Sequence, residues 1–579
     1  MGTASTKSRR RKKQRTAAQS RAVKKESAPL PEEEEALEDD ERPEMSERKW
    51  RISAAAILLT SAFLRLYDLR LVPAHHDEGV NGNFLLGLVR NGTYQYDPHN
   101  YHGPTLYYFA AVIPWLYRFI GGTSFRDAHG LTTFNIRLVT AAFGVGTVWL
   151  ALLLRKRIGT VGALSAAALI GISPGAVYFS RYFIHEMLFV FFTAGIVVAI
   201  LKYYDTARPL YLALAAASAG LMTATKETWI ISGPVLLIAL ITTEVYIWLR
   251  QRSTKKARKW KRAIIEPHGT ITERSRQTLE RFGGASAVAT YALVAIAVFL
   301  AVNVFFYSSF FTNYPKGVRD ALETLNLWSQ RTHEHGHPWW QYLEWLGEEE
   351  SPLLVLGGLG ALVAVWRADN RFALFAAQWA FGSLAAYSLV EYKTPWIALN
   401  FIVPLAITGG YTLGILYAEL RRWQQPRLFI ALAVLIVAIA GYQMLSLNFV
   451  HYDDDHYAYV YAHTRRDLLA MLEEVDRVAR LNGTGSDTGI TISAPEYWPL
   501  PWYLRDYKHV GYFGHVTSSD DAVIIASVGQ EAEVKATLGD RYQLISSGLP
   551  NSYAQRPGVA YSLRPGVDFL LYVRSNLAR

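Results

Sequence analysis

Leu428–Leu447 reads LFIALAVLIVAIAGYQMLSL, a run without a single charged side chain. A helix of this length is about 30 Å long at 1.5 Å of rise per residue, which matches the hydrocarbon core of a bilayer. Similar apolar runs recur through the chain from Ile52 onwards. About eleven of them are long enough to cross a membrane. The sequence therefore predicts an all-α polytopic membrane protein.

The predicted spans share an apolar composition and are separated by short polar segments. They are Ile52–Leu71, Phe134–Leu154, Val161–Phe179, Met187–Leu201, Leu210–Ala224, Trp229–Leu249, Ala285–Tyr307, Leu353–Trp366, Phe372–Val390, Ile397–Leu420 and Leu428–Leu447. Lys and Arg gather at 155–157, 250–281 and 421–422, and cytoplasmic loops are enriched in these residues. We therefore expect a multi-pass protein of the cell membrane with its N-terminus in the cytoplasm. Thr105–Ile120 is apolar too, but counting it as a span would put the 155–157 cluster outside, so we predict an interfacial helix in the first external loop.

Polar segments flank the predicted transmembrane domain, which covers residues 49–447. Residues 1–48 carry the basic cluster KSRRRKKQR and the acidic run EEEEALEDDERPE, a composition that predicts a disordered cytoplasmic tail. Residues 448–579 are predicted to form a small extracytoplasmic α/β domain, with a helix over 465–481 and strands at 488–493, 522–527, 542–546 and 569–574. The net charge of +10 is concentrated in the tail and loops, so it does not indicate nucleic-acid binding. The chain has no cysteine, which excludes disulfides and thiolate chemistry.

Ionisable side chains collect in the loops that this topology places outside. They are His75, His76, Asp77, Glu78, His102, Arg181, His185, Glu186, Lys226, Glu227, Glu391, Tyr392 and Lys393. An isolated His or Glu in a wet loop is ordinary surface, and the segment from His333 to His337 fits either a solvated loop or a metal site. In very short turns close to hydrocarbon, however, a charge costs several kcal/mol unless it is paired or hydrated. We therefore predict that these acids and bases converge on one hydrated cavity.

The chemistry that suits such a cavity is transfer from a lipid-linked phosphate. Arg and Lys neutralise a phosphate leaving group, and a carboxylate can take the proton from an attacking hydroxyl. No nucleotide-binding motif is visible in the sequence. A sugar carried on a polyprenyl phosphate needs only these groups.

Several motifs in this order resemble a known superfamily. HHDEGVNG, YHGPTLYY, SRYFIHE, TATKETW and YKTPW resemble the loop motifs of the protein O-mannosyltransferase and aminoarabinose transferase families, which are membrane glycosyltransferases of the GT-C fold. Together with PEYWPLPWYLRDY, they are similar to a prokaryotic branch labelled flippase-activity-associated proteins. The resemblance covers about residues 50–450 for the superfamily and reaches the C-terminal segment for the branch.

The resemblance implies roles for individual residues. Asp77 would be the general base, Glu78 would help to orient it or the acceptor, and Glu186 would be the second acidic residue. The expected phosphate and substrate contacts are Arg181, Lys226, Lys393, Tyr392 and His102. His76 and His185 flank the acidic residues, so a divalent metal ion is left open.

The sequence thus predicts an inverting glycosyltransferase that moves a sugar from a polyprenyl-phosphate donor to an acceptor hydroxyl at the extracytoplasmic face. The acceptor is left open among protein, lipid and polysaccharide, and membrane lipids surround the apolar helices. Trp498, Trp502 and Tyr503 fit either core packing or sugar stacking. The alternative is a flippase for lipid-linked sugars, or an accessory subunit of one. Transporters usually place charges at the midplane and show internal repeats, and neither pattern is found here.

Overall fold

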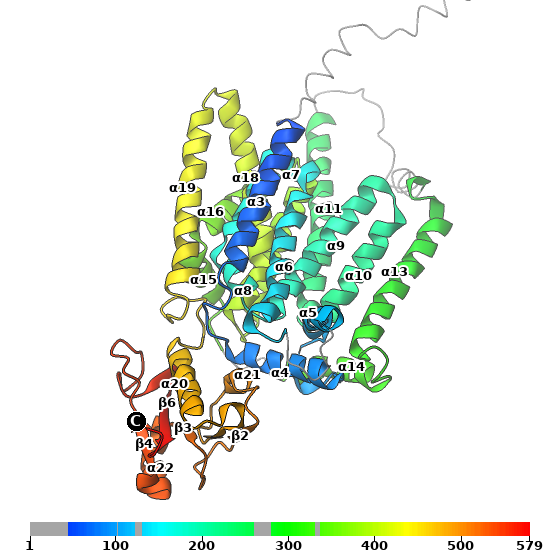
Figure 1. Cartoon of the computed structure of the whole chain (residues 1–579). Coiled ribbons are helices and arrows are strands. Elements are labelled where there is room, and N and C mark those ends of the chain that lie inside the picture. The colour runs from blue at the N-terminus through cyan, green and yellow to red at the C-terminus, as the bar shows by residue number, and fades with distance from the viewer. Residues whose placement is uncertain (1–44, 101, 122–129, 260–279, 331–335, 579) are drawn as a thin grey trace, which may run out of the picture. The chain divides into compact units, whose positions relative to one another are not determined.

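The structure, a computed structural model, describes residues 45–100, 102–121, 130–259, 280–330 and 336–578 (Figure 1). Most of the tail predicted at 1–48 lies outside these residues, as do much of the basic loop predicted at 250–281 and the first part of the 333–337 segment. The chain divides into two units, Met1–Arg51 and Ile52–Arg579. The candidate site lies entirely within the second unit.

The helices that precede the C-terminal domain are α3 (Glu47–Leu66), α4 (His76–Asn91), α5 (Thr105–Gly121), α6 (Thr133–Leu152), α7 (Arg155–Ile172), α8 (Pro174–Ser180), α9 (Glu186–Thr206), α10 (Pro209–Thr223), α11 (Trp229–Lys259), α13 (Gly284–Tyr307), α14 (Lys316–Ser329), α15 (Gln341–Glu349), α16 (Ser351–Arg367), α17 (Arg371–Leu389), α18 (Leu399–Arg422) and α19 (Pro426–Leu445). Among the described residues, 7 helices are long and apolar enough to cross a membrane, or up to 9 if the bent pairs α7–α8 and α15–α16 each form one span. Each predicted span overlaps a helix of this set, including the shorter α10 and the less apolar α3, but Val161–Phe179 runs across two helices, α7 and α8, which are bent by 58° at their junction. The prediction of a mostly helical, multi-span membrane protein is confirmed, while the number of spans stays a prediction.

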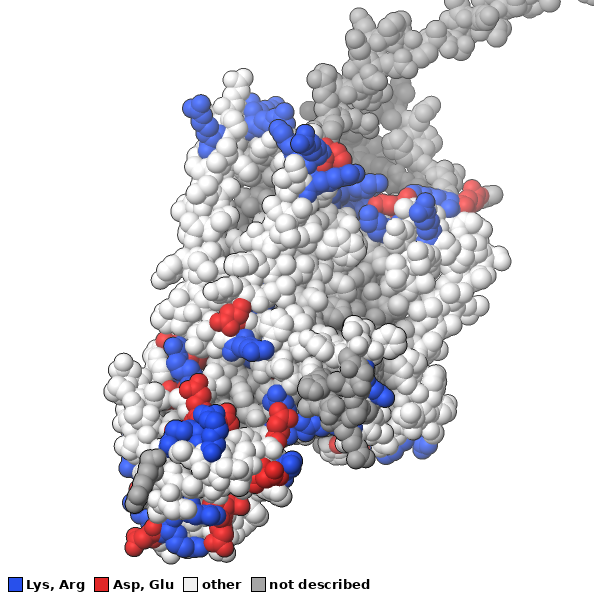
Figure 2. Space-filling model, viewed as in Figure 1, with Lys and Arg blue, Asp and Glu red and all other residues white. Residues whose placement is uncertain are grey.

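Charged side chains are distributed as a membrane-spanning bundle requires. Figure 2 shows Lys, Arg, Asp and Glu at the two ends of the visible face, with a broad band free of charge between them. A charge in that band would have to be stripped of water at a cost of several kcal/mol. The band therefore corresponds to the surface that faces lipid.

Helices α7 and α18 approach each other through glycine. A Cβ added to Gly410 would lie 2.4 Å from the carbonyl oxygen of Gly162, and one added to Gly414 would lie 3.3 Å from the Cα of Gly162. Small residues allow two helix backbones to meet closely, which is how helices associate where no hydrophobic driving force exists between them. These glycines hold the centre of the bundle together.

Two arginines satisfy backbone carbonyls around the end of α3. The guanidinium of Arg65 is fully buried and donates at 2.9 to 3.3 Å to the carbonyl oxygens of Ser61, Ile170 and Gly171. The guanidinium of Arg181 donates to the carbonyl oxygens of Leu64, Tyr67 and Asp68. Because the last carbonyls of a helix have no partner within it, Arg181 closes the end of α3 and Arg65 closes the end of α7.

Helix α4 lies where the sequence predicted only loop. Figure 1 shows it running across the lower ends of the upright helices, beside α5 and α14. Glycines at 79, 82 and 87 interrupt its sequence, and each costs about 1 kcal/mol of helix propensity relative to alanine. Packing therefore overrides local preference here. Helix α5 coincides with the interfacial helix predicted at Thr105–Ile120.

The C-terminal domain contains a mixed sheet with helices on both faces. Its elements are α20 (Asp467–Leu481), β1 (Gly489–Ile492), α21 (Leu500–Tyr503), β2 (His509–Tyr512), β3 (Val523–Ser527), α22 (Glu531–Leu538), β4 (Tyr542–Ile545), β5 (Tyr561–Arg564) and β6 (Val567–Arg574). The strand order is β2-β1-β3-β6-β4, with β5 also paired to β6. Strand β1 pairs in parallel with β2 and β3, and β6 pairs antiparallel with β3, β4 and β5. The prediction of a small α/β domain is confirmed; β2, β5, α21 and α22 are additional to the predicted elements.

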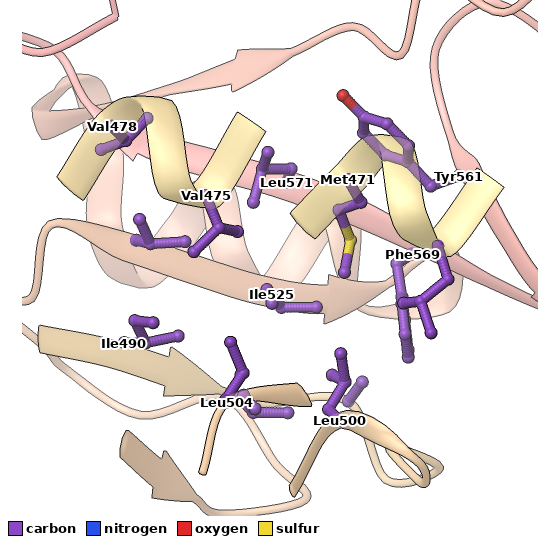
Figure 3. Close-up of a cluster of buried hydrophobic side chains, with 14 of the residues drawn as sticks. Met471, Val475, Val478, Ile490, Leu500, Leu504, Ile525, Tyr561, Phe569 and Leu571 are labelled. Carbon is purple, nitrogen blue, oxygen red and sulfur yellow. The ribbon is translucent and has the colours of Figure 1, made fainter. Parts of the chain in front are cut away.

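The larger core of this domain lies between the sheet and α20. Figure 3 shows Met471, Val475 and Val478 of α20 directed at Ile525 and Leu571 of the sheet. Helix α20 places these side chains at i, i+4 and i+7, one face of a helix. A second cluster joins α22 to the opposite face of the same strands. The loop from β1 to α21 is thereby held on a rigid scaffold.

Candidate functional site

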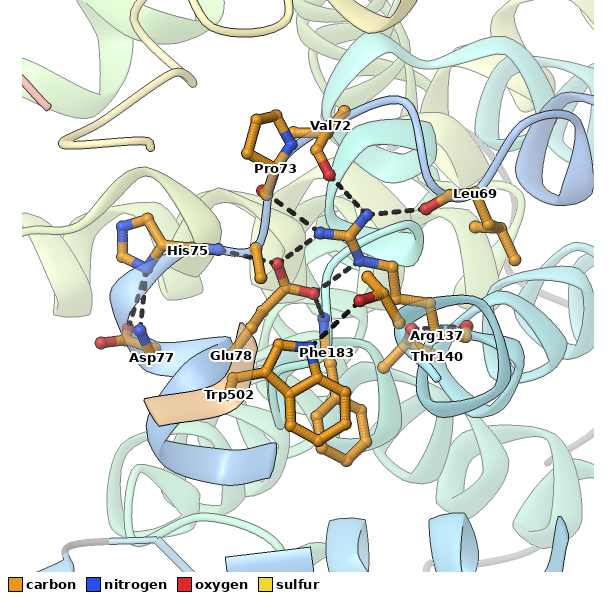
Figure 4. A network of polar contacts seen from close by, with 12 residues as sticks. Leu69, Val72, Pro73, His75, Asp77, Glu78, Arg137, Thr140, Phe183 and Trp502 are labelled. Carbon is orange, nitrogen blue, oxygen red and sulfur yellow. Dashed lines mark hydrogen bonds and ion pairs between the residues drawn. The ribbon is translucent and has the colours of Figure 1, made fainter. Parts of the chain in front are cut away.

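Glu78 anchors the first turn of α4. Its carboxylate is fully buried and receives two charge-assisted hydrogen bonds from Arg137 of α6, at 2.7 and 2.6 Å (Figure 4). The backbone N–H groups of His75 and Phe183 donate to the same carboxylate at 3.0 and 2.7 Å. Arg137 also donates to the carbonyl oxygens of Leu69, Val72 and Pro73. Glu78 is thus saturated, and it fixes the helix that carries Asp77.

Asp77 is the exposed member of the acidic pair. Its side chain is 42% exposed, and Figure 4 shows it directed away from the Glu78–Arg137 pair. His75 caps the helix by accepting a hydrogen bond at Nδ1 from the N–H of Asp77, at 3.1 Å. Burial lowers the pKa of His75 to about 4, so its ring is neutral at pH 7. Within the described ranges no Lys or Arg forms an ion pair with Asp77, which leaves its carboxylate open to a ligand.

The first and third outer loops are joined by an antiparallel bridge between His102 and Lys226. The loops meet closely, because a Cβ added to Gly103 would lie 2.0 Å from the carbonyl oxygen of Ala224. His102 also pairs with the third loop through its ring, whose Nδ1 lies 2.8 Å from Oε1 of Glu227. The contact fixes the ring, so its Nε2 is the nitrogen available to a ligand.

Carboxylates from three loops surround Tyr392. Glu186 begins α9 and forms a buried ion pair with Lys226. Burial raises the pKa of Tyr392, and the charges of Asp77, Glu186 and Glu227 raise it further. All three carboxylates therefore act on one phenol. Lys226 and Glu186 are in contact, and the convergence of Asp77 and Tyr392 with them on one hydrated cavity stays a prediction.

Two of the predicted phosphate contacts are bound to backbone instead. Arg181 directs both terminal nitrogens at carbonyl oxygens of the α3 end. Lys393 is 1% exposed, and its Nζ donates to the carbonyl oxygens of Val390 and His337 at 2.5 and 3.2 Å. Both side chains thus stabilise loop backbone, and a role in phosphate binding stays a prediction for each.

The predicted metal ligands do not form a cluster. His185 is fully buried, and its Nε2 lies 3.0 Å from the carbonyl oxygen of Gly103. The ring of His76 lies 6.1 Å from that of Trp498. Among the described residues, one group of three or more Asp, Glu or His residues has its ligand atoms within 4.8 Å of one another. This group is Asp454, Asp455 and His456, none of which was predicted as a site residue. The residues of the site do not fit a metal ion, so no step of the chemistry is assigned to one.

The C-terminal domain docks on α4 through the segment around α21. The indole of Trp502 is 1% exposed. It packs directly against Gly82, where an added Cβ would lie 2.5 Å from the indole ring. Its Nε1 donates to Thr133 at 3.1 Å, and the hydroxyl of Tyr503 accepts from the N–H of Ala74 at 2.7 Å. Core packing, and not sugar stacking, accounts for these two aromatic residues.

Arg137 and Arg564 escaped the sequence prediction of the site, and Glu227 was predicted to lie in the cavity but was given no role of its own. Arg137 lies in an otherwise apolar span, and an arginine in such a place signals a buried acidic partner. Glu227 adjoins Lys226 in the TKETW motif and holds His102. Arg564, on β5, acts on both His75 and His76 through its charge. No local pattern in the sequence links Arg564 to the first loop.

Together, the helical bundle, the helices α4 and α5 beside it and the small C-terminal sheet domain define the fold class of the chain. The chain has the GT-C fold, as its loop motifs predicted. Residues 111–257 match the family described as dolichyl-phosphate-mannose-protein mannosyltransferase. Membership of the flippase-activity-associated branch stays a prediction.

Solved structures with this fold differ widely from the chain in sequence. ArnT from Cupriavidus metallidurans bound to undecaprenyl phosphate is 15% identical, with a TM-score of 0.60 over 92% of this chain and 100% of that one. The apo state of the same protein gives a TM-score of 0.51 at 15% identity, over 92% of this chain and 99% of that one. The Archaeoglobus fulgidus oligosaccharyltransferase tethered to an acceptor peptide gives 0.50 at 14% identity, over 92% of this chain and 77% of that one. No curated protein matches the sequence.

Proposed function

We propose that this protein transfers a sugar from a polyprenyl-phosphate donor to an acceptor hydroxyl, at the extracytoplasmic face of the cell membrane. The observation that carries the proposal is the contrast within the acidic pair. Glu78 is buried and saturated by Arg137, whereas Asp77, one residue earlier, is exposed and free of cationic partners among the described residues. One residue thus holds the helix, and the other is presented to a substrate.

Asp77 acts as the general base. An exposed carboxylate can take the proton of the acceptor hydroxyl as that oxygen attacks the anomeric carbon. The polyprenyl phosphate then leaves from the opposite face of the sugar in a single displacement. The anomeric configuration is therefore inverted.

Lys226 and His102 face the phosphate of the donor. An ammonium has three donors, so Lys226 can keep its ion pair with Glu186 and still reach a phosphate oxygen. His102 is fixed by Glu227 and has its other ring nitrogen available. A buried cation stabilises the negative charge that develops on the leaving group better than one in water does.

The fold supports this class of donor. ArnT, which shares the fold, binds undecaprenyl phosphate, and the family that matches residues 111–257 is described by a dolichyl-phosphate sugar donor. Both are polyprenyl-type lipid phosphates. The distribution of Lys and Arg in the sequence supports a site outside the cytoplasm, which is where the donor's sugar would be presented.

The test is sugar transfer in reconstituted vesicles that contain radiolabelled polyprenyl-phosphate sugars and candidate acceptors. Asp77→Asn should lower the rate of transfer by roughly 10²- to 10⁴-fold, the usual contribution of a general base. Asp97→Asn is the matched control, because Asp97 belongs to the same loop and pairs with His99 at the surface; it should transfer at the wild-type rate. Passage of intact lipid-linked sugar across the bilayer, equal in wild type and Asp77→Asn, would show a flippase and refute the proposal.

A further inference from the structure

A group of side chains from the C-terminal domain lies beside Asp77 and takes no part in the chemistry above. The ring of Trp498 lies 6.1 Å from the ring of His76, the residue before Asp77. The charges of Arg564 and Glu496 act on the same His76 ring, as does that of Asp77. The domain therefore contributes to the surroundings of the base.

Glu496 and Arg564 are tied to each other, while Trp498 packs against α4, where a Cβ added to Gly79 would lie 3.2 Å from its ring. Arg564 forms an ion pair with Glu496, and it donates from Nη1 to the carbonyl oxygen of Trp498 at 3.3 Å. Trp502 and Tyr503, a few residues further on, are committed to docking. Trp498 is partly buried, and no hydrogen bond of its indole to the transmembrane helices is found among the described residues.

Polar groups accompany the ring. The side chain of Glu496 is 58% exposed and that of Arg564 is 17% exposed. Both can therefore hydrogen-bond to a ligand while they stay paired, since a carboxylate accepts at two oxygens and a guanidinium has five N–H donors.

Two further aromatic rings continue from Trp498 across the domain. The ring of Tyr497 lies 6.2 Å from that of Trp498, and the ring of Tyr512 lies 5.0 Å from that of Tyr497. All three side chains are partly buried, so each is held in place while part of it faces outward. We call Trp498, Tyr497 and Tyr512 the aromatic stripe.

An aromatic face flanked by an acid and a guanidinium has the chemistry of a carbohydrate site. A pyranose ring has an apolar C–H face, which suits an amphipathic aromatic ring, and a rim of hydroxyls, which suits Glu and Arg. Peptides are instead recognised mainly at open strand edges or in apolar grooves. The charged pair beside Trp498 favours a carbohydrate, while Tyr512 lies on the edge strand β2, so a peptide is the competing ligand.

We propose that the aromatic stripe, with Glu496 and Arg564, binds the acceptor, and that the acceptor is a glycan. The terminal sugar stacks on Trp498, with its hydroxyl directed at Asp77, and the next sugars follow the stripe outward. The inference rests on the proposed transferase function, because the stripe is named as the acceptor side of that reaction.

The test is binding of neutral oligosaccharides of defined sequence to the full-length protein in lipid nanodiscs, next to Ser/Thr-containing peptides of similar mass. We expect a subset of the oligosaccharides to bind. Trp498→Leu and Glu496→Gln should each weaken that binding about tenfold, the loss typical of one anchoring residue. Phe513→Leu is the matched control, because its ring is exposed on the same domain outside the stripe, and binding should not change.

Asp77→Asn separates this inference from the proposed function. The variant keeps the aromatic stripe, so it should still bind the glycan, and yet it should fail to transfer sugar. Glu496→Gln alters an exposed side chain, so it remains informative if the tryptophan variant does not fold. Binding of peptides and not of oligosaccharides, or oligosaccharide binding unchanged in Glu496→Gln and Trp498→Leu, would overturn the glycan acceptor without touching the transferase. Transfer unaffected in Asp77→Asn would instead overturn the function.

Discussion

Replacing Arg137 with methionine isolates the interaction that positions the general base. The substitution keeps the approximate length of the side chain and removes its two hydrogen bonds to Glu78 and three to backbone carbonyls. Glu78 is fully buried, so its charge would be left with only two backbone N–H donors. Removing one partner of a buried ion pair costs about 3–5 kcal/mol. We therefore expect Arg137→Met to lower the free energy of unfolding by that amount.

A second substitution tests whether the uncompensated charge is the cause. Glu78→Gln removes the charge and retains one acceptor oxygen, so it should cost only about 1–3 kcal/mol. Adding Glu78→Gln to Arg137→Met should then cost little further, because no charge remains to be buried. The expected coupling between the two sites is about 2 kcal/mol, within the range found for contacting residues.

The assay is denaturant-induced unfolding of detergent-solubilised protein, followed by tryptophan fluorescence, for the wild type, both single variants and the double variant. Arg51→Met is the control, because Arg51 and Glu47 form an exposed ion pair of the same chemistry, and such pairs contribute little. The reasoning is refuted if Arg137→Met is no less stable than Arg51→Met. Strict additivity of the two single substitutions would refute it equally.

Two further predictions concern the packing and capping of α4. Gly82→Ala should reduce sugar transfer and stability, because its Cβ would lie 2.5 Å from the buried indole of Trp502. Such overpacking costs about 1–3 kcal/mol. Gly87→Ala is the control on the same helix: its Cβ would meet nothing within 4 Å, so thermal unfolding should show it to be neutral or stabilising. Burial lowers the pKa of His75 to about 4, from about 6.5 for an unperturbed histidine. The free energy of unfolding contributed by the neutral ring is therefore complete above about pH 6.5. It falls by up to about 3 kcal/mol as the pH drops towards 4. His75→Asn keeps a capping acceptor and should show a flatter decline between these pH values; an identical decline would contradict this origin.

The bundle could be predicted from the sequence because its signal is local. Runs such as Leu428–Leu447 exceed the thickness of the hydrocarbon core without reference to any other part of the chain. Helix α4 could not be predicted from the sequence, because glycine weakens it locally. It is stabilised by contacts with Trp502, which lies about 420 residues after Gly82 in the chain. Strands β2 and β5 are only four residues long, and they form strands because they pair with β1 and β6.

The site shows the same division. Asp77 and Lys226 follow apolar spans directly, so their place at the membrane surface is readable from the order of the chain. The different roles of Asp77 and Glu78 cannot be read from the sequence, because the partner of Glu78, Arg137, lies 59 positions later in the chain and contacts it only after folding. Likewise, the use of Arg181 for carbonyl capping depends on how α3 ends, which its own loop does not specify.

The arginines around α3 also constrain how the protein is made. Arg65 leaves the ribosome long before residues 170 and 171, whose carbonyl oxygens it binds. Until then it is a cation without these partners in the last turn of α3. Arg181 completes the arrangement from the other direction by closing the α3 end. The first helix therefore reaches its final depth only after α7 and α8 have been synthesised, which makes membrane insertion of this bundle a cooperative event and not a sequence of independent steps.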